Sequence, residues 1–148
     1  ILIGTVGRLS KEKNQILLIQ AAAELVKNHS HLKFMIVGEG PEENNLKDSV
    51  AQHNLTEHFI FTGLLMDTPS VYGAIDLFVL PSLTEGIPLT ILEAMASKTI
   101  VVATKVGGIP EIIQDNKTGL LAESQNRDNL ISKINFLLRN KEKQEIPL

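Results

Sequence analysis

The sequence predicts an α/β fold, a doubly wound, Rossmann-like parallel sheet with helices on both faces. Short apolar runs, typical of strands covered on both sides, alternate with segments whose apolar residues recur at helical spacing. Glycines follow several of these runs and mark the turns that lead into the helices. Alternating strands and helices are the pattern of a parallel sheet, and 148 residues suit a single domain.

The composition narrows the function classes. Lys and Arg number 14 against 17 Asp and Glu, for a net charge of −3, which gives no indication of a nucleic-acid partner. The chain has no Cys, so it forms neither disulfides nor thiolate metal sites, and its four His lack the spacing of metal ligands. We therefore expect no metal. The apolar runs fall short of the roughly 20 residues that cross a membrane, so we expect no transmembrane segment.

The first predicted strand spans residues 1–6. Because the chain begins inside this strand-like run, at Ile1, we expect a fragment of a longer protein. A basic loop, Gly7–Lys13, follows the strand, and Asn14 is a residue type that caps helices. The next helix is indicated by apolar residues at helical spacing, namely Ile16, Ile19, Ala22, Ala23 and Val26.

The second strand is predicted over 32–37, followed by a turn, 38–41, and a helix that contains Leu46, Val50 and Ala51. The turn glycines only weakly match a dinucleotide-binding fingerprint, since its third glycine falls on a glutamate. That helix also begins with two glutamates, Glu42 and Glu43, which complement the helix dipole themselves and repel a phosphate. If a diphosphate binds a helix start in this chain, we therefore expect it at the later helix that Pro88 opens rather than at this one.

A third strand, 59–62, closes at Gly63, and a short helix begins at Asp67 and runs to Ile75. Leu77–Leu80 is wholly apolar and predicts a strand buried on both faces. The later elements are strands over 99–103 and 118–122, a glycine turn into a short helix over 107–113, and a final amphipathic helix marked by Leu130, Ile134, Leu137 and Leu138.

The centre of the prediction is the stretch after Leu77–Leu80. A loop, 81–87, carries Glu85 and Gly86, and Pro88 then opens a helix, since proline suits the first helical position. Open α/β sheets bind ligands at the carboxyl ends of their strands. The unpaired N–H groups and the dipole of the helix start, which is free of acids, make an anion site.

Glu93 stands out in the helix that Pro88 opens. It lies among apolar residues, so we expect part of it to be shielded from water. Neither Lys nor Arg lies three or four positions away, so no neighbour on the helix would neutralise it. Helical side chains lean toward the N-terminus of their helix, and Glu93 is therefore a candidate ligand-binding residue at the anion site.

Glu85 and Glu93 are separated by seven residues, across a Gly-x-Pro-Leu turn, and Ala-Met-Ala follows them. They resemble the E-x7-E signature of retaining glycosyltransferases of group 1, also called family four, which have the two-domain GT-B fold. The resemblance covers about residues 4–122 and includes Gly7-Arg8-x-x-x-x-Lys13 and the glycine turn at 107–113. It implies that this chain is the C-terminal, donor-binding half of such an enzyme, with an amino-terminal acceptor domain absent.

The resemblance also implies roles for single residues. The diphosphate of a UDP- or GDP-sugar would bind Arg8, Lys13 and the turn residues Gly86, Ile87, Pro88, Leu89 and Thr90. Glu93 would accept hydrogen bonds from the ribose hydroxyls, and Glu85, the catalytic candidate, would meet the donor sugar. Gly63 and Leu64 would contact the base. No cofactor beyond this donor substrate is expected.

On this basis residues 1–140 form the nucleotide-sugar domain and 141–148 a charged tail. The acceptor would be a glycan or lipid of polysaccharide, lipopolysaccharide or glycolipid biosynthesis. The expected location is cytoplasmic, with the missing half as the part that would contact the inner face of the membrane.

Two positions depart from the family pattern, because Lys98 and Asn14 stand where glycine is common. The helix end at Lys98 therefore either loses its left-handed cap or adopts it at some cost. Two other functions stay open. One is a nucleotide-sugar epimerase or phosphorylase-like enzyme on the same scaffold. The other is a non-catalytic nucleotide-binding or signalling module, although the acid cluster of receiver modules is missing after the first strand, where Gly7 and Arg8 stand.

Overall fold

The computed structural model describes residues 1–142, which form one six-stranded parallel sheet. The predicted α/β class is confirmed. The strand order is β3-β2-β1-β4-β5-β6. The strands are β1 (Leu2–Val6), β2 (Lys33–Val37), β3 (Phe59–Gly63), β4 (Leu77–Leu80), β5 (Ile100–Thr104) and β6 (Leu120–Ala122).

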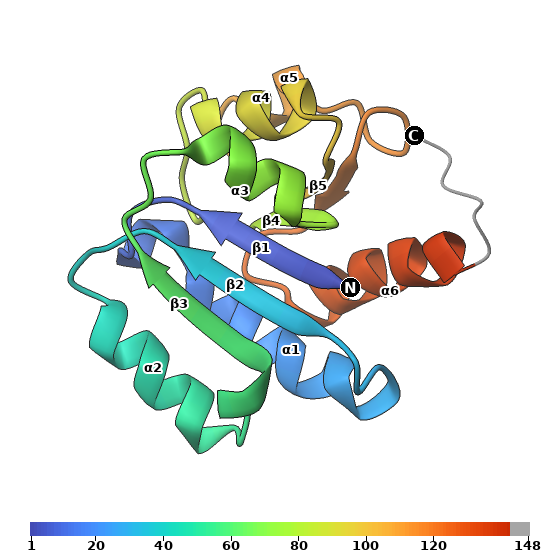
Figure 1. Cartoon of the computed structure of the whole chain (residues 1–148). Helices are drawn as coiled ribbons and strands as arrows, with labels where there is room; N and C mark the ends of the chain where they lie inside the picture. The colour runs from blue at the N-terminus through green and yellow to red at the C-terminus, as the bar shows by residue number, and fades with distance from the viewer. Residues whose placement is uncertain (143–148) are drawn as a thin grey trace.

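Helices cover both faces of the sheet (Figure 1), as a doubly wound topology requires. The α-helices are α1 (Gln15–Asn28), α2 (Glu43–Gln52), α3 (Thr68–Ala74), α4 (Leu89–Ala96), α5 (Ile109–Ile112) and α6 (Arg127–Glu142). Two 3₁₀ turns are η1 (Lys11–Lys13) and η2 (Thr56–His58). In Figure 1, α1, α2 and α6 lie on one side of the sheet, and α3, α4 and α5 on the other.

Strand β4 contributes to both apolar layers. Leu77 and Val79 belong to the cluster that packs against α1, α2 and α6, whereas Phe78 and Leu80 belong to the cluster beneath α3, α4 and α5. All four side chains are buried. The prediction of a strand covered on both faces is therefore confirmed, since side chains alternate sides along a strand.

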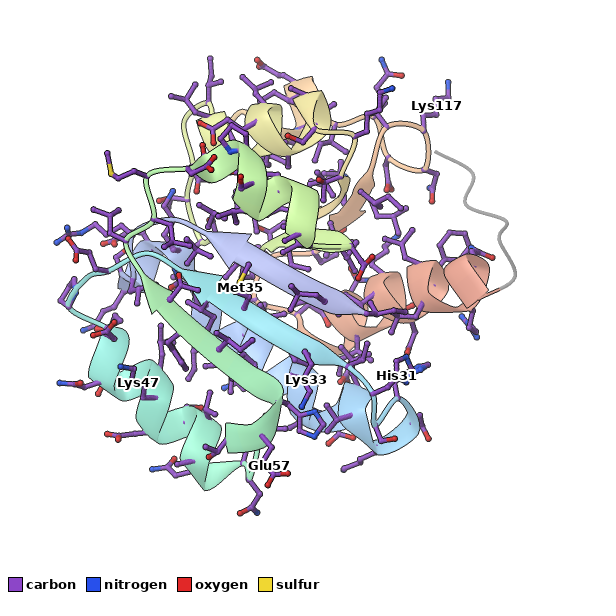
Figure 2. All side chains as sticks on the ribbon, in the orientation of Figure 1. His31, Lys33, Met35, Lys47, Glu57 and Lys117 are labelled. Atoms are coloured by element: carbon purple, nitrogen blue, oxygen red, sulfur yellow. The ribbon has the colours of Figure 1, made fainter. Side chains whose placement is uncertain are left out.

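The carboxyl ends of the strands form the edge where the site is predicted. At the opposite edge, Lys33 Nζ donates a 2.5 Å hydrogen bond to the carbonyl of Glu57, which fastens the start of β2 to η2 (Figure 2). The direction of winding reverses between β1 and β4, which are neighbours in the sheet although they are not consecutive strands in the sequence. The neighbouring ends of β1 and β4 form the topological switch point, where the loops that follow them lead into helices on opposite faces of the sheet (Figure 1).

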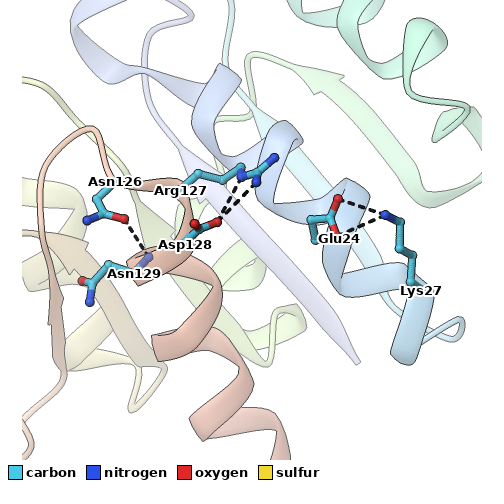
Figure 3. A network of polar contacts seen from close by, with 6 residues as sticks. All are labelled: Glu24, Lys27, Asn126, Arg127, Asp128 and Asn129. Atoms are coloured by element: carbon cyan, nitrogen blue, oxygen red, sulfur yellow. Dashed lines mark hydrogen bonds and ion pairs between the residues drawn. The ribbon is translucent and has the colours of Figure 1, made fainter.

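The last helix extends beyond the expected domain end. α6 runs to Glu142, two residues into the segment that the sequence assigned to a charged tail, and the rest of that segment lies outside the described residues. The side chain of Asn126 accepts a hydrogen bond from the N–H of Asn129 at 2.9 Å (Figure 3). This cap satisfies one of the unpaired donors at the start of α6.

The end of α4 has a Schellman motif at the predicted position. Lys98 is left-handed, with φ 59°, its N–H bonds the carbonyl of Met95 at 3.0 Å, and the N–H of Thr99 bonds that of Ala94 at 2.9 Å. Of the two outcomes expected at Lys98, the structure has the second, a left-handed cap adopted by a residue with a Cβ.

Candidate functional site

The loops after β1 and β4 meet at the switch point through an ion pair. Lys13 Nζ donates a 2.6 Å hydrogen bond to Glu85 Oε1, across 72 positions of sequence. Only 6% of the Glu85 side chain is exposed, against 27% for Lys13. The hydroxyl of the buried Ser82 donates to the same carboxylate oxygen at 2.8 Å. Two of the residues predicted for the donor site are therefore brought into direct contact.

The backbone of the Glu85 loop is fastened on three sides. The N–H of Leu83 donates to the carbonyl of Glu12 at 2.7 Å, which ties the loop to η1. The hydroxyl of Thr104 donates to the carbonyl of Ser82 at 2.6 Å, from the end of β5. The N–H of Gly108 donates to the carbonyl of Gly86 at 3.0 Å. These bonds fix where the Glu85 side chain starts.

Gly107 makes the third of these contacts possible. Its φ is +53°, and a Cβ placed there would lie 1.7 Å from the carbonyl oxygen of Glu85. A side chain cannot occupy that space, and the left-handed conformation disfavours a Cβ in any case. The glycine turn at 107–113 therefore supports the Glu85 loop from below.

The basic loop after β1 is shaped by its backbone. Asn14 occupies the N-cap position of α1, as predicted, but it is left-handed, with φ 52°, and its side chain makes no capping hydrogen bond. Its place is explained by backbone conformation, because asparagine tolerates the left-handed region that glycine adopts freely. Gln15 Nε2 instead fastens the loop by donating to the carbonyl of Arg8 at 2.9 Å.

Arg8 lies on the rim of a cleft at the carboxyl ends of β1, β2 and β3. Its side chain is exposed. The cleft holds about 340 Å³, within the range of small-molecule sites. Leu64, a predicted base contact, lines the same cleft, whereas Gly63 does not line it. Glu39 also lines it and places an acid at this end.

The start of α2 differs from that of α4, as predicted. Glu42 is the N-cap of α2 and Glu43 lies in its first turn, whereas the first turn of α4 carries no acid. The turn before α2 is closely packed, because a Cβ on Gly38 would lie 1.9 Å from the carbonyl oxygen of Gly7. Gly38 is therefore explained by this close approach of two loops.

At α4 the helix begins one residue later than predicted. Pro88 is the N-cap, with extended φ −77° and ψ 108°, and Leu89 is the first helical residue. Within the described residues, no hydrogen bond is donated by the backbone N–H groups of Gly86, Ile87, Leu89 or Thr90. Gly86 is exposed, and a Cβ added to it would meet nothing within 4 Å. The turn is therefore open on its outer side.

Glu93 is more exposed than the sequence predicts. The apolar residues around it include Leu89 and Leu92, which are themselves 67% and 42% exposed, so this side of α4 does not face the core. The carboxylate of Glu93 is near Tyr72 of α3. The hydroxyl of Tyr72 is buried and has no hydrogen-bond partner in the described part of the chain. Burial raises the pKa of Tyr72, and the Glu93 carboxylate adds to the rise.

Ser82, Gln15 and Thr104 were not predicted as site residues. Gln15 donates to the carbonyl of Arg8, Ser82 to the carboxylate of Glu85, and Thr104 to the carbonyl of Ser82. A serine after a strand and a threonine at the end of another are ordinary residues in sequence, so no local signal could have identified them.

Among the side chains that the structure describes, those of residues 1–140, no cluster of three or more His, Asp or Glu could hold a metal ion. Over residues 1–142, no helix combines the length and the apolar character needed to span a membrane.

Comparison with known proteins identifies the family. The model of the family described as glycosyl transferases group 1 matches residues 1–147. This chain belongs to that family. The predicted resemblance is confirmed, including the Rossmann-like half of the GT-B fold.

Curated relatives of this glycosyl transferase group 1 chain include a 2-deoxystreptamine glucosyltransferase from Streptomyces kanamyceticus, 37% identical over 81% of this chain and 32% of the relative. Another is the Escherichia coli UDP-Gal:α-D-GlcNAc-diphosphoundecaprenol α-1,3-galactosyltransferase, 34% identical over 86% of this chain and 34% of the relative. The chain thus spans about a third of the length of these relatives.

Solved structures agree. Anabaena HepE, in complex with UDP, superposes with a TM-score of 0.89 at 27% identity, over 98% of this chain and 41% of HepE. The C-terminal domain of a glycosyl transferase group 1 protein, LpcC of Francisella tularensis, gives a TM-score of 0.88 at 33% identity, over 98% of this chain and 78% of that domain structure. The shared fold thus includes a structure determined as a C-terminal domain.

Proposed function

We propose that this chain is the donor-binding domain of a retaining glycosyltransferase that moves a sugar from a nucleoside-diphosphate sugar to a glycan or lipid acceptor. The observation that carries the proposal is the contact between Lys13 and Glu85 at the switch point of the sheet. Phosphate-binding and sugar-binding groups must be adjacent in such a site, because the sugar is bonded to the diphosphate. Group membership and the UDP in the HepE structure add support.

In the proposed reaction the bond between the sugar and the diphosphate oxygen breaks, and its electron pair remains on the diphosphate. The oxygen of an acceptor hydroxyl forms the new bond to the sugar, and its proton passes to the departing diphosphate. Negative charge therefore grows on the diphosphate in the transition state, and fixed donors aimed at it lower the barrier. Arg8, Lys13 and the N–H groups of Gly86, Ile87, Leu89 and Thr90 are the donors proposed here.

The other proposed residues contact the remaining parts of the donor, which are the sugar, the ribose and the base. Glu85 faces the sugar and is the proposed catalytic residue, while Pro88 shapes the turn that presents the N–H donors. Glu93 accepts from the ribose hydroxyls, and Leu64 contacts the base from the cleft that Arg8 borders. Gly63 precedes Leu64 and is proposed as a base contact through its backbone, although it does not line that cleft.

The family match favours sugar transfer over the two other functions that the sequence leaves open. The named relatives are transferases, which argues against an epimerase and against a non-catalytic signalling module. The domain boundaries, an amino-terminal acceptor domain and a cytoplasmic location belong to the same proposal.

Calorimetric titration of the chain with UDP and GDP tests the proposal. We expect weak binding of at least one of them in EDTA, because the proposed donors are cationic side chains and backbone N–H groups. Binding that appears only after Mg²⁺ is added would contradict this mode of recognition.

A radiolabel transfer assay tests the domain assignment. The isolated chain should not transfer sugar, because transfer requires donor and acceptor to be held together in a cleft that excludes water. The full-length protein should be active, and its Glu85→Ala variant should lose turnover more than nucleotide affinity. Robust transfer by the isolated chain would overturn the assignment.

A further inference from the structure

The Lys13–Glu85 ion pair poses a question about ligand binding. In the free protein the two side chains neutralise each other at 2.6 Å, and the carboxylate is almost completely shielded from water. Yet the proposed function assigns Lys13 to the diphosphate and Glu85 to the sugar. A ligand must therefore compete with a contact that already exists.

The two partners are not equally free to move. Glu85 Oε1 accepts from both Lys13 Nζ and Ser82 Oγ, at 2.6 and 2.8 Å, and the loop that carries Glu85 is held by backbone bonds from Leu83 and Gly108. Lys13 has a long side chain that is 27% exposed. An arriving anion can therefore attract the ammonium group, whereas the carboxylate stays in place.

The second oxygen of the carboxylate is available. Oε2 of Glu85 accepts no hydrogen bond from the side chains and backbone that the structure describes, and it is not among their buried unpaired atoms. A sugar hydroxyl can donate to it. Such a bond would compensate the buried negative charge when Lys13 turns toward the diphosphate, since a buried charge that loses its partner is destabilising.

We propose that this ion pair makes the site discriminate between the intact nucleotide-sugar and the nucleoside diphosphate that remains after transfer. The inference rests on the proposed function and names Glu85 as a specificity-determining residue within it. A nucleotide-sugar supplies both an anion for Lys13 and hydroxyl donors for Glu85. A nucleoside diphosphate supplies only the anion, so drawing Lys13 away from Glu85 leaves the buried carboxylate without a partner. Glu85 therefore weakens the binding of the product and favours its release.

The test measures the affinity of the chain for UDP and for UDP-glucose, with GDP and GDP-mannose as the second pair. Glu85→Gln keeps the size of the side chain and its bond from Ser82, and removes the charge. We expect this variant to bind the nucleoside diphosphate about tenfold more tightly, the scale of one charge-assisted hydrogen bond. Affinity for the nucleotide-sugar should not rise, so the preference for the intact donor should fall.

A matched control separates this effect from a general change of net charge. Glu24 pairs with Lys27 on α1 at 3.0 Å, and both side chains are well exposed, at 40% and 65% (Figure 3). Glu24→Gln removes the same charge and should leave both affinities unchanged. In a Lys13→Met background, Glu85→Gln should no longer tighten diphosphate binding, because the ammonium group that Glu85 holds away from the diphosphate is absent.

Glu85→Asp serves the same comparison if the amide variant does not fold, since its shorter side chain draws the carboxylate away from Lys13. An unchanged or weakened affinity for the nucleoside diphosphate in a folded Glu85 variant would overturn the inference, as would a gain that persists with Lys13→Met. If the unaltered chain binds none of the four nucleotides, the proposed function fails and the inference with it. Binding without a gain in the variant defeats the inference alone.

Discussion

The two glycine turns that meet at the site differ in what surrounds them. Gly107 is enclosed, and a Cβ there would lie 1.7 Å from the carbonyl oxygen of Glu85. Gly86 is open, and a Cβ there would meet nothing within 4 Å. The first glycine is explained by the folded chain itself. The second leaves space that nothing in the described residues fills, which is what a ligand-binding turn requires.

The same division extends over the rest of the site. Ser82 and Thr104 are completely buried and, with the nearly buried Glu85 side chain, form a fixed floor. Arg8 and Gly86 are exposed on a rim around it. Substitutions in the floor should therefore lower the free energy of unfolding. Substitutions on the rim should change ligand affinity and leave stability nearly unaltered.

Gly107→Ala should have the largest effect. The left-handed conformation costs a residue with a Cβ about 1–2 kcal/mol, and the clash with the Glu85 carbonyl adds to that cost. We expect the free energy of unfolding, measured by urea denaturation, to fall by more than about 2 kcal/mol. Gly86→Ala is the matched control and should change it by less than about 0.5 kcal/mol. Equal losses for the two variants would break the comparison.

Arg8→Ala tests the rim. A hydrogen bond to a charged group contributes about 1.5–3 kcal/mol, so the affinity for UDP or GDP should fall about tenfold or more, by calorimetry, whereas the affinity for the nucleoside should not change. Lys11→Ala is the control, because Lys11 is an exposed cation of the same loop that lies outside the Gly-Arg-x-x-x-x-Lys pattern. A comparable loss from Lys11→Ala would reduce the role of Arg8 to general attraction.

Glu93→Gln should have a smaller effect on affinity. The amide keeps the size of the side chain but accepts hydrogen bonds less well than a carboxylate, a difference of about 1 kcal/mol, or roughly fivefold in affinity. Because Glu93 is exposed, the variant should fold normally. The informative ligand is a 2′,3′-dideoxynucleoside diphosphate. If its binding weakens as much as that of the parent nucleotide, Glu93 does not contact the ribose.

Most of the fold could be predicted because its signals are local. The four residues of β4 are all apolar, and a strand buried on both faces is the simplest structure for them. At Lys98 the sequence left two outcomes open, a lost cap or a left-handed residue with a Cβ, because the helical pattern does not show which conformation the residue after the helix adopts. The predicted start of α4 was wrong by one residue, since Pro88 is the N-cap and not the first helical residue. The extended and helical conformations of proline share φ and differ only in ψ, so the sequence does not distinguish them.

The contacts within the site were less predictable. Lys13 and Glu85 were each singled out, but their direct pairing depends on how two loops 72 positions apart are fastened to one another. Glu93 illustrates the reverse case. Apolar neighbours in sequence suggested shielding, yet Leu89 and Leu92 are themselves exposed, so the composition of a helix segment did not fix which side faces the core.

The smallest predicted effect concerns the far end of α4. Lys98 is left-handed, with φ 59°, and its substitution by glycine removes the strain of the Cβ. Glycine also makes the unfolded chain more flexible, which offsets part of the gain. Lys98→Ala provides the control, because it removes the same charge from the helix end and retains the strain. We expect Lys98→Gly to be more stable than Lys98→Ala by about 1 kcal/mol in urea denaturation.

The affinity of these two variants completes the comparison between floor and rim. Lys98 lies at the C-terminal end of α4, whereas the proposed diphosphate donors lie at its start. If the rim binds ligand through groups already in place, a change in helix stability at the other end should not alter the affinity for UDP or GDP. Equal affinities for the Gly and Ala variants, together with unequal stabilities, would support a preformed site. A tighter complex with Lys98→Gly would show instead that ligand binding orders α4, and the separation of stability from affinity would then fail for this helix.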